Sequence, residues 1–159
     1  MKVLIKAPAK INLALNILSK REDGYHDVEM IMQTVSLYDK ISITLNNHNK
    51  INLDCKLDFL SDNKKNTAYI AAQTFFEFTK IDNPGIDIVI EENIPQAAGL
   101  AGGSADAAGV IVGLDNIFNT KLCDKDLINI GSKIGADVPF SILGGTMAAT
   151  GIGTELRRI

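Results

Sequence analysis

Residues 86–118 contain the sequence feature that most restricts what this chain can fold into. Ile86–Glu91 alternates apolar and polar residues, which predicts a half-buried strand. A loop with three glycines follows, and from Ser104 to Phe118 apolar residues recur at helical spacing. We expect Ser104 to cap this helix and Asp106 to lie in its first turn, where the helix dipole favours a carboxylate. The stretch is therefore predicted to be a strand, a glycine-rich loop and a helix in direct succession.

The loop between this strand and this helix is suited to binding a phosphate group. Gly99, Gly102 and Gly103 allow backbone N–H groups to approach a ligand closely, and a helix N-terminus offers unpaired N–H donors. The loop lacks the Gly-Lys-Ser/Thr ending of a Walker A motif and the spacing of a dinucleotide-binding fingerprint. A glycine-rich turn with no ligand is the simpler interpretation, and the loop alone leaves both open.

The remaining segments predict an α+β domain in which a run of strands is followed by mixed helices. Alternating apolar residues predict two extended segments around Pro8 within residues 2–18, and a polar turn follows at 19–26. Asn66 is expected to cap a helix through Thr79 whose phenylalanines pack against the sheet. The other expected elements are strands at 28–37, 41–45, 51–55 and 146–150, a turn at 38–40, a polar loop at 46–50, a polar connection at 56–65 and a helix at 124–134.

Three places outside the glycine loop carry candidate residues for chemistry. Lys10 and Asn12 lie opposite the apolar row of the second extended segment, and their spacing alone favours a solvated strand face. Tyr25 and His26 follow a polar turn, where such a pair is ordinarily exposed. Asp137 stands in a break before a proline, where an aspartate often caps a turn. The residues by themselves leave a structural and a functional interpretation open at each place.

The charge and the apolar pattern argue against several classes of partner. The formal net charge is −3 and the isoelectric point is near 5.3, which disfavours general binding to nucleic acids or anionic membranes. No apolar run approaches the ~20 residues of a transmembrane helix, and the run at the N-terminus is too short for a signal peptide. Cys55, Cys123 and His48 lack metal-ligand spacing. We therefore expect a cytoplasmic protein with no nucleic-acid or membrane partner.

Four strings, in this order along nearly the whole chain, resemble one enzyme superfamily. They are Pro8–Leu13 (PAKINL), Asp23–His26 (DGYH), Pro95–Asp106 (PQAAGLAGGSAD) and Gly135–Pro139 (GADVP). The third string is similar to the phosphate-binding motif of the galactokinase, homoserine kinase, mevalonate kinase and phosphomevalonate kinase superfamily. The first two resemble the branch that phosphorylates diphosphocytidyl methylerythritol in the non-mevalonate isoprenoid pathway. The resemblance implies an α+β fold like domain 2 of ribosomal protein S5, with a mixed sheet packed by helices.

The resemblance also implies roles for the candidate residues outside the loop. Asp137 would take or orient the proton of the attacking 2-hydroxyl, and Lys10 would stabilise that carboxylate and the developing phosphoryl charge. Asn12 would help to hold the reacting end of the small-molecule substrate, diphosphocytidyl methylerythritol. Tyr25 and His26 would hold its cytidine by stacking and by hydrogen bonds to the base edge. A strand lysine and a turn aspartate must then meet near the loop.

The resemblance implies ATP and Mg²⁺ as cofactors. The implied residues suffice for the chemistry, because phosphoryl transfer requires the protein mainly to position the reactants and to stabilise charge. Ser104 would contact a phosphate or the Mg²⁺ ion. The residues implied to hold the ATP phosphates form one continuous stretch: Pro95, Gln96, Ala97, Ala98, Gly99, Leu100, Ala101, Gly102, Gly103, Ser104 and Ala105.

Two features depart from the family pattern. Ala97, Ala98 and Ala101 stand where family members often carry glycine, so we expect a tighter loop that works if these positions need no positive φ. Family members also carry a further C-terminal domain, so we expect residues 1–159 to be the ATP-binding N-terminal domain of a longer monomeric or homodimeric enzyme. The alternatives are an inactive nucleotide-binding fragment, another small-molecule kinase of the superfamily, and an RNA-binding module with the same fold.

Overall fold

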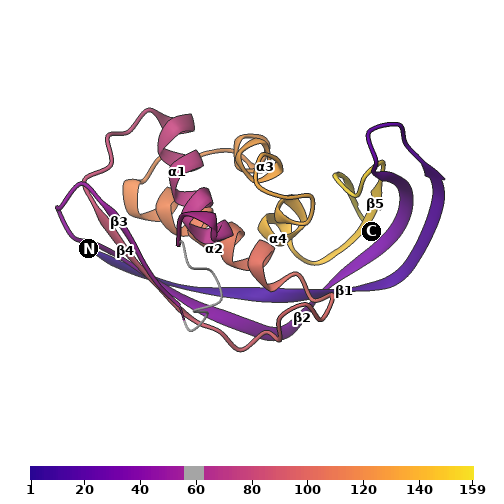
Figure 1. Ribbon diagram of the computed structural model, residues 1–159, viewed down its shortest axis with the longest axis horizontal. Helices are drawn as coiled ribbons and strands as arrows, with labels where there is room; N and C mark the ends of the chain where they lie inside the picture. The colour runs from indigo at the N-terminus through magenta and orange to yellow at the C-terminus, as the bar shows by residue number, and fades with distance from the viewer. Residues whose placement is uncertain (56–62) are drawn as a thin grey trace.

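Within the residues that the computed structural model describes, 1–55 and 63–159, a six-stranded mixed sheet carries four helices on one face (Figure 1). The strands are β1 (Lys2–Lys20), β2 (His26–Leu45), β3 (Ile51–Cys55), β4 (Ile86–Glu91), β5 (Thr146–Thr150) and β6 (Glu155–Arg158). The helices are α1 (Thr67–Thr79), α2 (Gly102–Phe118), α3 (Asp124–Ser132) and α4 (Val138–Leu143), with a single 3-10 turn, η1, at Asn63–Lys65. None of the helices in the described parts of the chain is long and apolar enough to cross a membrane.

Strand β2 is the centre of the sheet. Along one edge it pairs antiparallel with β1, and along the other it pairs antiparallel with β4 near its C-terminal end and with β5 near its N-terminal end. Strand β3 lies parallel to β4, and β6 lies antiparallel to β5. The sheet order is thus β3-β4-β2-β5-β6 with β1 along the free edge of β2, which confirms the predicted mixed α+β architecture.

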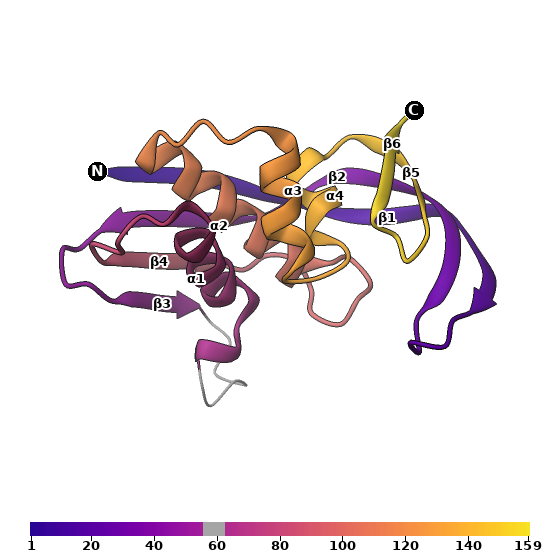
Figure 2. The ribbon, with the colours of Figure 1, turned by 90° about the horizontal axis from the view of Figure 1, so that it is seen from above.

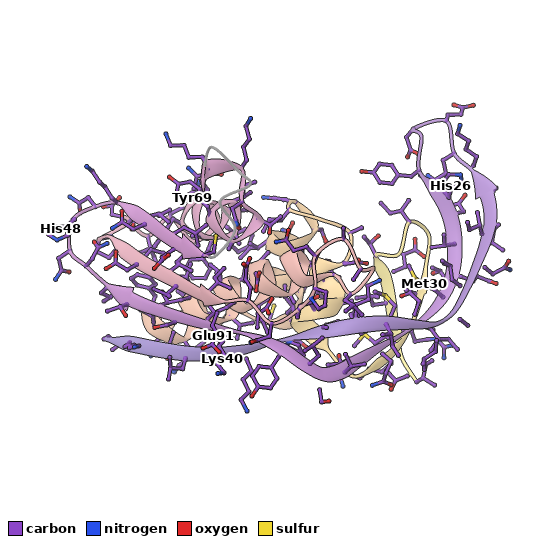
Figure 3. All side chains as sticks on the ribbon, turned by 60° about the horizontal axis from the view of Figure 1, so that its bottom comes forward. His26, Met30, Lys40, His48, Tyr69 and Glu91 are labelled. Atoms are coloured by element: carbon purple, nitrogen blue, oxygen red, sulfur yellow. The ribbon has the colours of Figure 1, made fainter. Side chains whose placement is uncertain are left out.

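Strands β1 and β2 form one long hairpin whose closed end extends beyond the helices on the side of β5 and β6 (Figure 2). Its continuity corrects two predictions. The break expected at Pro8 is only a register shift between Pro8 and Lys10, and pairing resumes on both sides of it. The turn expected at 38–40 is absent, because these residues continue in β2 and Lys40 also forms an ion pair with Glu91 of β4 at 2.9 Å (Figure 3).

Most of the other predicted elements are confirmed. Strands occupy 51–55, 86–91 and 146–150, and the Asn66 side chain caps α1 by accepting a hydrogen bond from Ala68 N–H at 2.9 Å. The polar loop at 46–50 is present and exposes His48. Of the polar connection expected at 56–65, residues 56–62 lie outside the described residues and 63–65 form η1. Helix α4 and strand β6 were not predicted, because six and four residues are too few to show a period.

The inner and outer sides of β1 are the reverse of those that the spacing predicts. The apolar row faces outwards, and Lys10, which was expected on a solvated face, is buried. Leu15 and Ile17 are 54% and 61% exposed, whereas Lys10 is only 7% exposed. The register shift between Pro8 and Lys10 is a bulge that places two successive residues, Ala9 and Lys10, on the inner side. A bulge changes which side chains face the core, and an alternating pattern cannot reveal it.

The main core lies between the sheet and helices α1, α2 and α3. Phe75 of α1 is fully buried, and its ring centroid lies 5.9 Å from that of Phe76 and 6.4 Å from that of Phe118. Phe78 of α1 is partly buried and packs against the same core, so the packing role predicted for the phenylalanines of this helix is confirmed. A second, smaller core beneath the hairpin consists of four buried side chains: Met32, Phe140, Met147 and Ala149.

Helix α2 lies close to the sheet because two of its glycines face the strands. A Cβ atom at Gly113 would come within 2.7 Å of Ile43 Cδ1 and 3.3 Å of Ile5 Cγ1. At Gly109 a Cβ atom would come within 2.5 Å of Ile41 Cδ1. This close approach sets the height above the sheet at which α2 and the loop before it begin.

Replacing Gly113 with valine is expected to lower the free energy of unfolding by about 1–3 kcal/mol, because the larger side chain overpacks the interface with β1 and β2. Asn116→Val adds the same side chain on the exposed face of α2 and is expected to change stability by less than about 0.5 kcal/mol. Urea unfolding followed by circular dichroism compares the two. Equal effects would show that Gly113 does not set the distance between α2 and the sheet.

Candidate active site

The loop from β4 enters α2 three residues earlier than predicted. Ala101 is the N-cap residue and Gly102 the first helical residue, so Ser104 lies inside the first turn rather than capping it. Asp106 lies beyond that turn instead of within it, and it is buried. The cap residue makes no side-chain hydrogen bond, so it leaves the first N–H groups of α2 available to a ligand.

Two alanines of the loop adopt the left-handed conformation. Ala97 has φ +52° and Ala101 has φ +57°. We expected the loop to work with alanine if these positions need no positive φ, and this condition is not met. The left-handed conformation costs an L-residue roughly 1–2 kcal/mol, and glycine avoids this cost. The chain nevertheless adopts it at both positions of the loop between β4 and α2. Ala98 is not among the residues with positive φ.

A pocket of about 430 Å³ lies beside this loop. Its lining includes residues 94–104, the segment 65–67 before and at the start of α1, and the acidic residues Asp39, Glu92 and Asp106. Thr67 Oγ1 donates a hydrogen bond to the Gly103 carbonyl at 2.7 Å, so the start of α1 is joined directly to the start of α2. Sequence reasoning identified Asn66 only as a helix cap and missed that this segment forms a wall of the pocket.

Lys10 and Asp137 are in contact, as the resemblance led us to expect. Lys10 Nζ lies 3.6 Å from Asp137 Oδ2, and the Lys10 side chain is 9% exposed against 33% for Asp137. The Lys10 backbone N–H donates to the Leu100 carbonyl at 3.1 Å, which places this ion pair next to the glycine loop. Lys10 Nζ also donates to Asn12 Oδ1 at 3.2 Å. The structure therefore brings Lys10, Asn12, Asp137 and the loop together.

Ser104 lies between the loop and the turn that carries Asp137. A Cβ atom built at Gly135 would be 4.0 Å from Ser104 Oγ, so the hydroxyl is near the start of that turn. Asp137 is held there as the residue preceding α4, whose first turn contains Pro139. A proline in the first turn fixes the backbone without losing a helical hydrogen bond, which accounts for the Asp-Val-Pro order.

Tyr25 and His26 lie apart from this ion pair, at the closed end of the long hairpin. Figure 3 shows His26 at one end of the molecule and His48 at the other. Tyr25 is 58% exposed, and among the described residues neither side chain lines the pocket beside the glycine loop. The turn is braced by Arg21, whose guanidinium contacts Asp27 at 2.9 Å and Asp23 at 3.1 Å. The hydrogen bond from Arg21 holds the pKa of Asp27 below its ordinary value.

Two carboxyl groups that sequence reasoning did not select lie beneath the loop. Asp39 is 2% exposed and Asp106 is 6% exposed, and both line the pocket beside the loop. Burial, followed by the charges of Asp39 and Glu92, raises the pKa of Asp106 to about 8. Asp106 is therefore protonated at neutral pH. No sequence pattern indicated the pair, since Asp39 was expected in a turn between two strands and Asp106 in the first turn of a helix.

Comparisons with known proteins agree on one family. The sequence profile described as GHMP kinases N terminal domain matches residues 66–145. The chain is 46% identical over 159 residues to a protein of Brevibacillus brevis and 49% identical over 155 residues to one of Caldicellulosiruptor bescii. Both relatives are named 4-diphosphocytidyl-2-C-methyl-D-erythritol kinase. The alignments cover 100% and 98% of this chain but 54% of each relative, so the chain spans about half the length of the curated relatives it matches.

Solved structures show the same fold. A crystal structure of 4-(cytidine 5'-diphospho)-2C-methyl-D-erythritol kinase matches with a TM-score of 0.84 at 32% identity, covering 99% of this chain and 55% of that one. The mevalonate kinase of Methanococcus jannaschii matches with a TM-score of 0.75 at 18% identity, covering 100% of this chain and 56% of that one. At that identity the second match supports the fold alone.

Replacing Ala101 with glycine is expected to raise the free energy of unfolding by up to about 1 kcal/mol, because relief of the left-handed conformation exceeds the added chain entropy. Ala98→Gly relieves no left-handed conformation and is expected to lower the free energy of unfolding by about 0.5–1 kcal/mol. Thermal unfolding of the two variants tests this contrast. A loss of stability in both would contradict the backbone conformation described for Ala101.

Asp106→Asn is expected to become progressively more stable than the wild type as the pH rises. The folded wild type keeps the Asp106 proton to about pH 8, whereas an unfolded aspartate loses it near 3.8, so its stability falls as the pH rises through that range. Asparagine, by contrast, has no proton to lose. Melting temperatures between pH 4 and pH 8 should diverge, and a difference independent of pH would contradict the buried protonated state. Asp124→Asn, on an exposed residue of α3, is the control.

Proposed function

Because the chain belongs to the GHMP kinase family, we propose that it is the nucleotide-binding part of an ATP-dependent small-molecule kinase. The proposed reaction is phosphorylation of the 2-hydroxyl of 4-diphosphocytidyl-2-C-methyl-D-erythritol. This substrate is inferred from relatives that carry the same name and are 46% and 49% identical to this chain. Such a reaction on a small, highly polar substrate fits a cytoplasmic protein.

The observation that carries the proposal is the contact of Lys10 Nζ with Asp137 Oδ2 at 3.6 Å beside the Leu100 end of the loop. A phosphoryl group held by the loop would lie next to this ion pair. Transfer to an alcohol requires a group to accept or orient the hydroxyl proton and a cation to stabilise charge on the transferred phosphoryl group. One carboxylate and one ammonium group in contact meet both requirements.

In the proposed mechanism, Asp137 accepts a hydrogen bond from the 2-hydroxyl and takes its proton as the oxygen attacks the γ-phosphorus of ATP. The bond between that phosphorus and the β–γ bridging oxygen breaks, and ADP leaves. Lys10 stabilises the carboxylate before the transfer and the phosphoryl oxygens during it. Its largely buried position strengthens both interactions, because screening by water is reduced there. The Asn12 amide oxygen also accepts a hydrogen bond from Lys10 Nζ and helps to hold it in place.

The loop and the first turn of α2 fit the triphosphate of ATP. The first N–H groups of α2, which the N-cap side chain does not bind, and the partial positive charge at its start favour phosphate oxygens. Within residues 1–55 and 63–159, no group of three His, Cys, Asp or Glu side chains could hold a metal ion by itself. This fits a Mg²⁺ ion bound mainly by phosphate oxygens and water, with the Ser104 hydroxyl as the protein contact. When bound, Mg²⁺ neutralises charge on the phosphate oxygens.

The hairpin end is proposed to recognise the cytidine of the substrate. Tyr25 offers an exposed aromatic face and His26 a hydrogen-bonding ring, and the ion pairs of Arg21 hold the turn between them and β1. The substrate would extend along the inner side of the hairpin from this turn to Lys10. Because the chain spans about half of its relatives, a second candidate is nucleotide binding without turnover by this part alone.

The test combines this chain with Mg-ATP and 4-diphosphocytidyl-2-C-methyl-D-erythritol, with the 2-phosphate product measured by mass spectrometry. The chain is assayed alone and extended by the C-terminal half of the Brevibacillus brevis relative. Asp137→Asn is expected to lower the rate at least about a hundredfold, because a general base accelerates such a reaction by a factor of about 10²–10⁴. Its affinity for Mg-ATP should remain within about threefold of the wild type, since the loop is unchanged.

Asp124→Asn removes an exposed carboxylate and should leave the rate unchanged. Product that persists in Asp137→Asn would contradict the assigned role of that residue. Binding of Mg-ATP without product in the short chain, with product in the extended chain, would support the second candidate for residues 1–159. No product and no binding in either form would refute the proposed function.

A further inference from the structure

Asp39 is a buried carboxylate that the proposed reaction does not use. It lies in the middle of β2 and is 2% exposed. One of its oxygens, Oδ1, accepts hydrogen bonds from two successive backbone N–H groups, those of Asn93 and Ile94, the second at 2.8 Å. The Asn93 side chain adds a bond to the Tyr38 carbonyl at 3.1 Å. The segment that leaves β4 and enters the phosphate loop is therefore attached to β2 chiefly through Asp39.

The other side of Asp39 faces the start of α2. A Cβ atom built at Gly102 would lie 3.8 Å from Asp39 Oδ2 and 3.2 Å from Ile94 Cγ2. Asp106, one turn further along α2, is buried and lies close enough to Asp39 for the charge of Asp39 to raise its pKa. One carboxylate thus contacts the loop where it leaves β4 and the helix that follows the loop. The phosphate-binding backbone lies between these two contacts.

A buried carboxylate is costly unless hydrogen bonds satisfy it, and Asp39 has two backbone donors, the N–H groups of Asn93 and Ile94. The loop itself contains two left-handed alanines and no side-chain cap for α2. Its conformation therefore depends on contacts with its surroundings. At the Leu100 end the contact comes from the Lys10 N–H, and at the Ile94 end it comes from Asp39.

We propose that Asp39 is a positioning residue of the phosphate loop, which it holds from below so that the N–H groups of the loop and of α2 keep one arrangement toward the triphosphate. The inference rests on the proposed function in that the ligand is a nucleoside triphosphate. It assigns to Asp39 no contact with ATP or with the second substrate. Its effect should therefore fall on the binding of the phosphates and not on the binding of the nucleoside.

The test compares Asp39→Leu, which removes both acceptor oxygens at similar volume, with Asp39→Asn, which keeps one oxygen for the two N–H groups and gains a donor toward Asp106. Calorimetry on this chain measures the Kd of Mg-ATP and of adenosine, which has no phosphate. Asp39→Leu is expected to weaken Mg-ATP at least about tenfold and adenosine less than about twofold. Asp39→Asn should stay within about threefold of the wild type for both.

Asp115→Leu is the matched control, because Asp115 also accepts a loop N–H, that of Leu122 at 3.0 Å, but at the opposite end of α2. It should leave the Kd of Mg-ATP unchanged. Equal weakening of Mg-ATP and adenosine by Asp39→Leu, or no weakening of either, would overturn the proposal. If Asp39→Leu does not fold, Asp106→Leu breaks only the contact with α2 and should weaken Mg-ATP selectively, and equal weakening of both ligands would again overturn the proposal.

Amide hydrogen exchange without any nucleotide separates this inference from the proposed function. In Asp39→Leu the amides of Asn93, Ile94 and residues 99–104 are expected to exchange at least about tenfold faster than in the wild type, while those of α1 do not change. Unchanged exchange in the loop would contradict the role of Asp39. A wild-type chain that binds no Mg-ATP would refute the proposed function, while the exchange data would still decide whether Asp39 holds the loop.

Discussion

The position of Lys10 is the constraint on which the rest of the site depends. Its backbone N–H binds the Leu100 carbonyl while its ammonium group contacts Asp137, so a single residue joins the first strand, the glycine loop and the turn before α4. The bulge after Pro8 makes this possible, because without it the Lys10 side chain would face away from the helices. Three segments separated by 90 and 37 residues in the sequence numbering therefore meet at one point of β1.

The close packing of α2 on the sheet makes this meeting geometrically possible. Gly109 and Gly113 let the helix axis approach β1 and β2, and the loop before the helix consequently lies low enough for Leu100 to reach the N–H of Lys10. The same low position brings the start of α2 over Asp39. The glycines within the helix are thus as important for the site as those in the loop, although they touch no part of the pocket beside it.

Periodicity was sufficient to predict the strand, loop and helix around residues 86–118 and the α+β class, and capping residues predicted the start of α1 at Asn66 but not that of α2. They failed where pairing between distant segments decides the outcome. The bulge that turns Lys10 inward, the continuation of β2 through Asp39 and the left-handed backbone of Ala101 all depend on neighbours that lie far away in the sequence. The contact between Lys10 and Asp137 was expected only from the family resemblance, because no local pattern relates a strand lysine to a distant turn.

Different backbone N–H groups serve Asp39 and the ligand, which explains how a pocket with acidic residues in its wall can bind an anion. The N–H groups of Asn93 and Ile94 point to Asp39 below the loop, whereas the first N–H groups of α2 are not used by a side-chain cap. The negative charge of Asp39 is therefore neutralised by donors that the ligand does not need, and Asp106 adds no charge while it keeps its proton. The loop thus contributes its donors to two different anions, a fixed carboxylate beneath it and a phosphate above it. Loss of the first would release the segment that aligns the donors for the second.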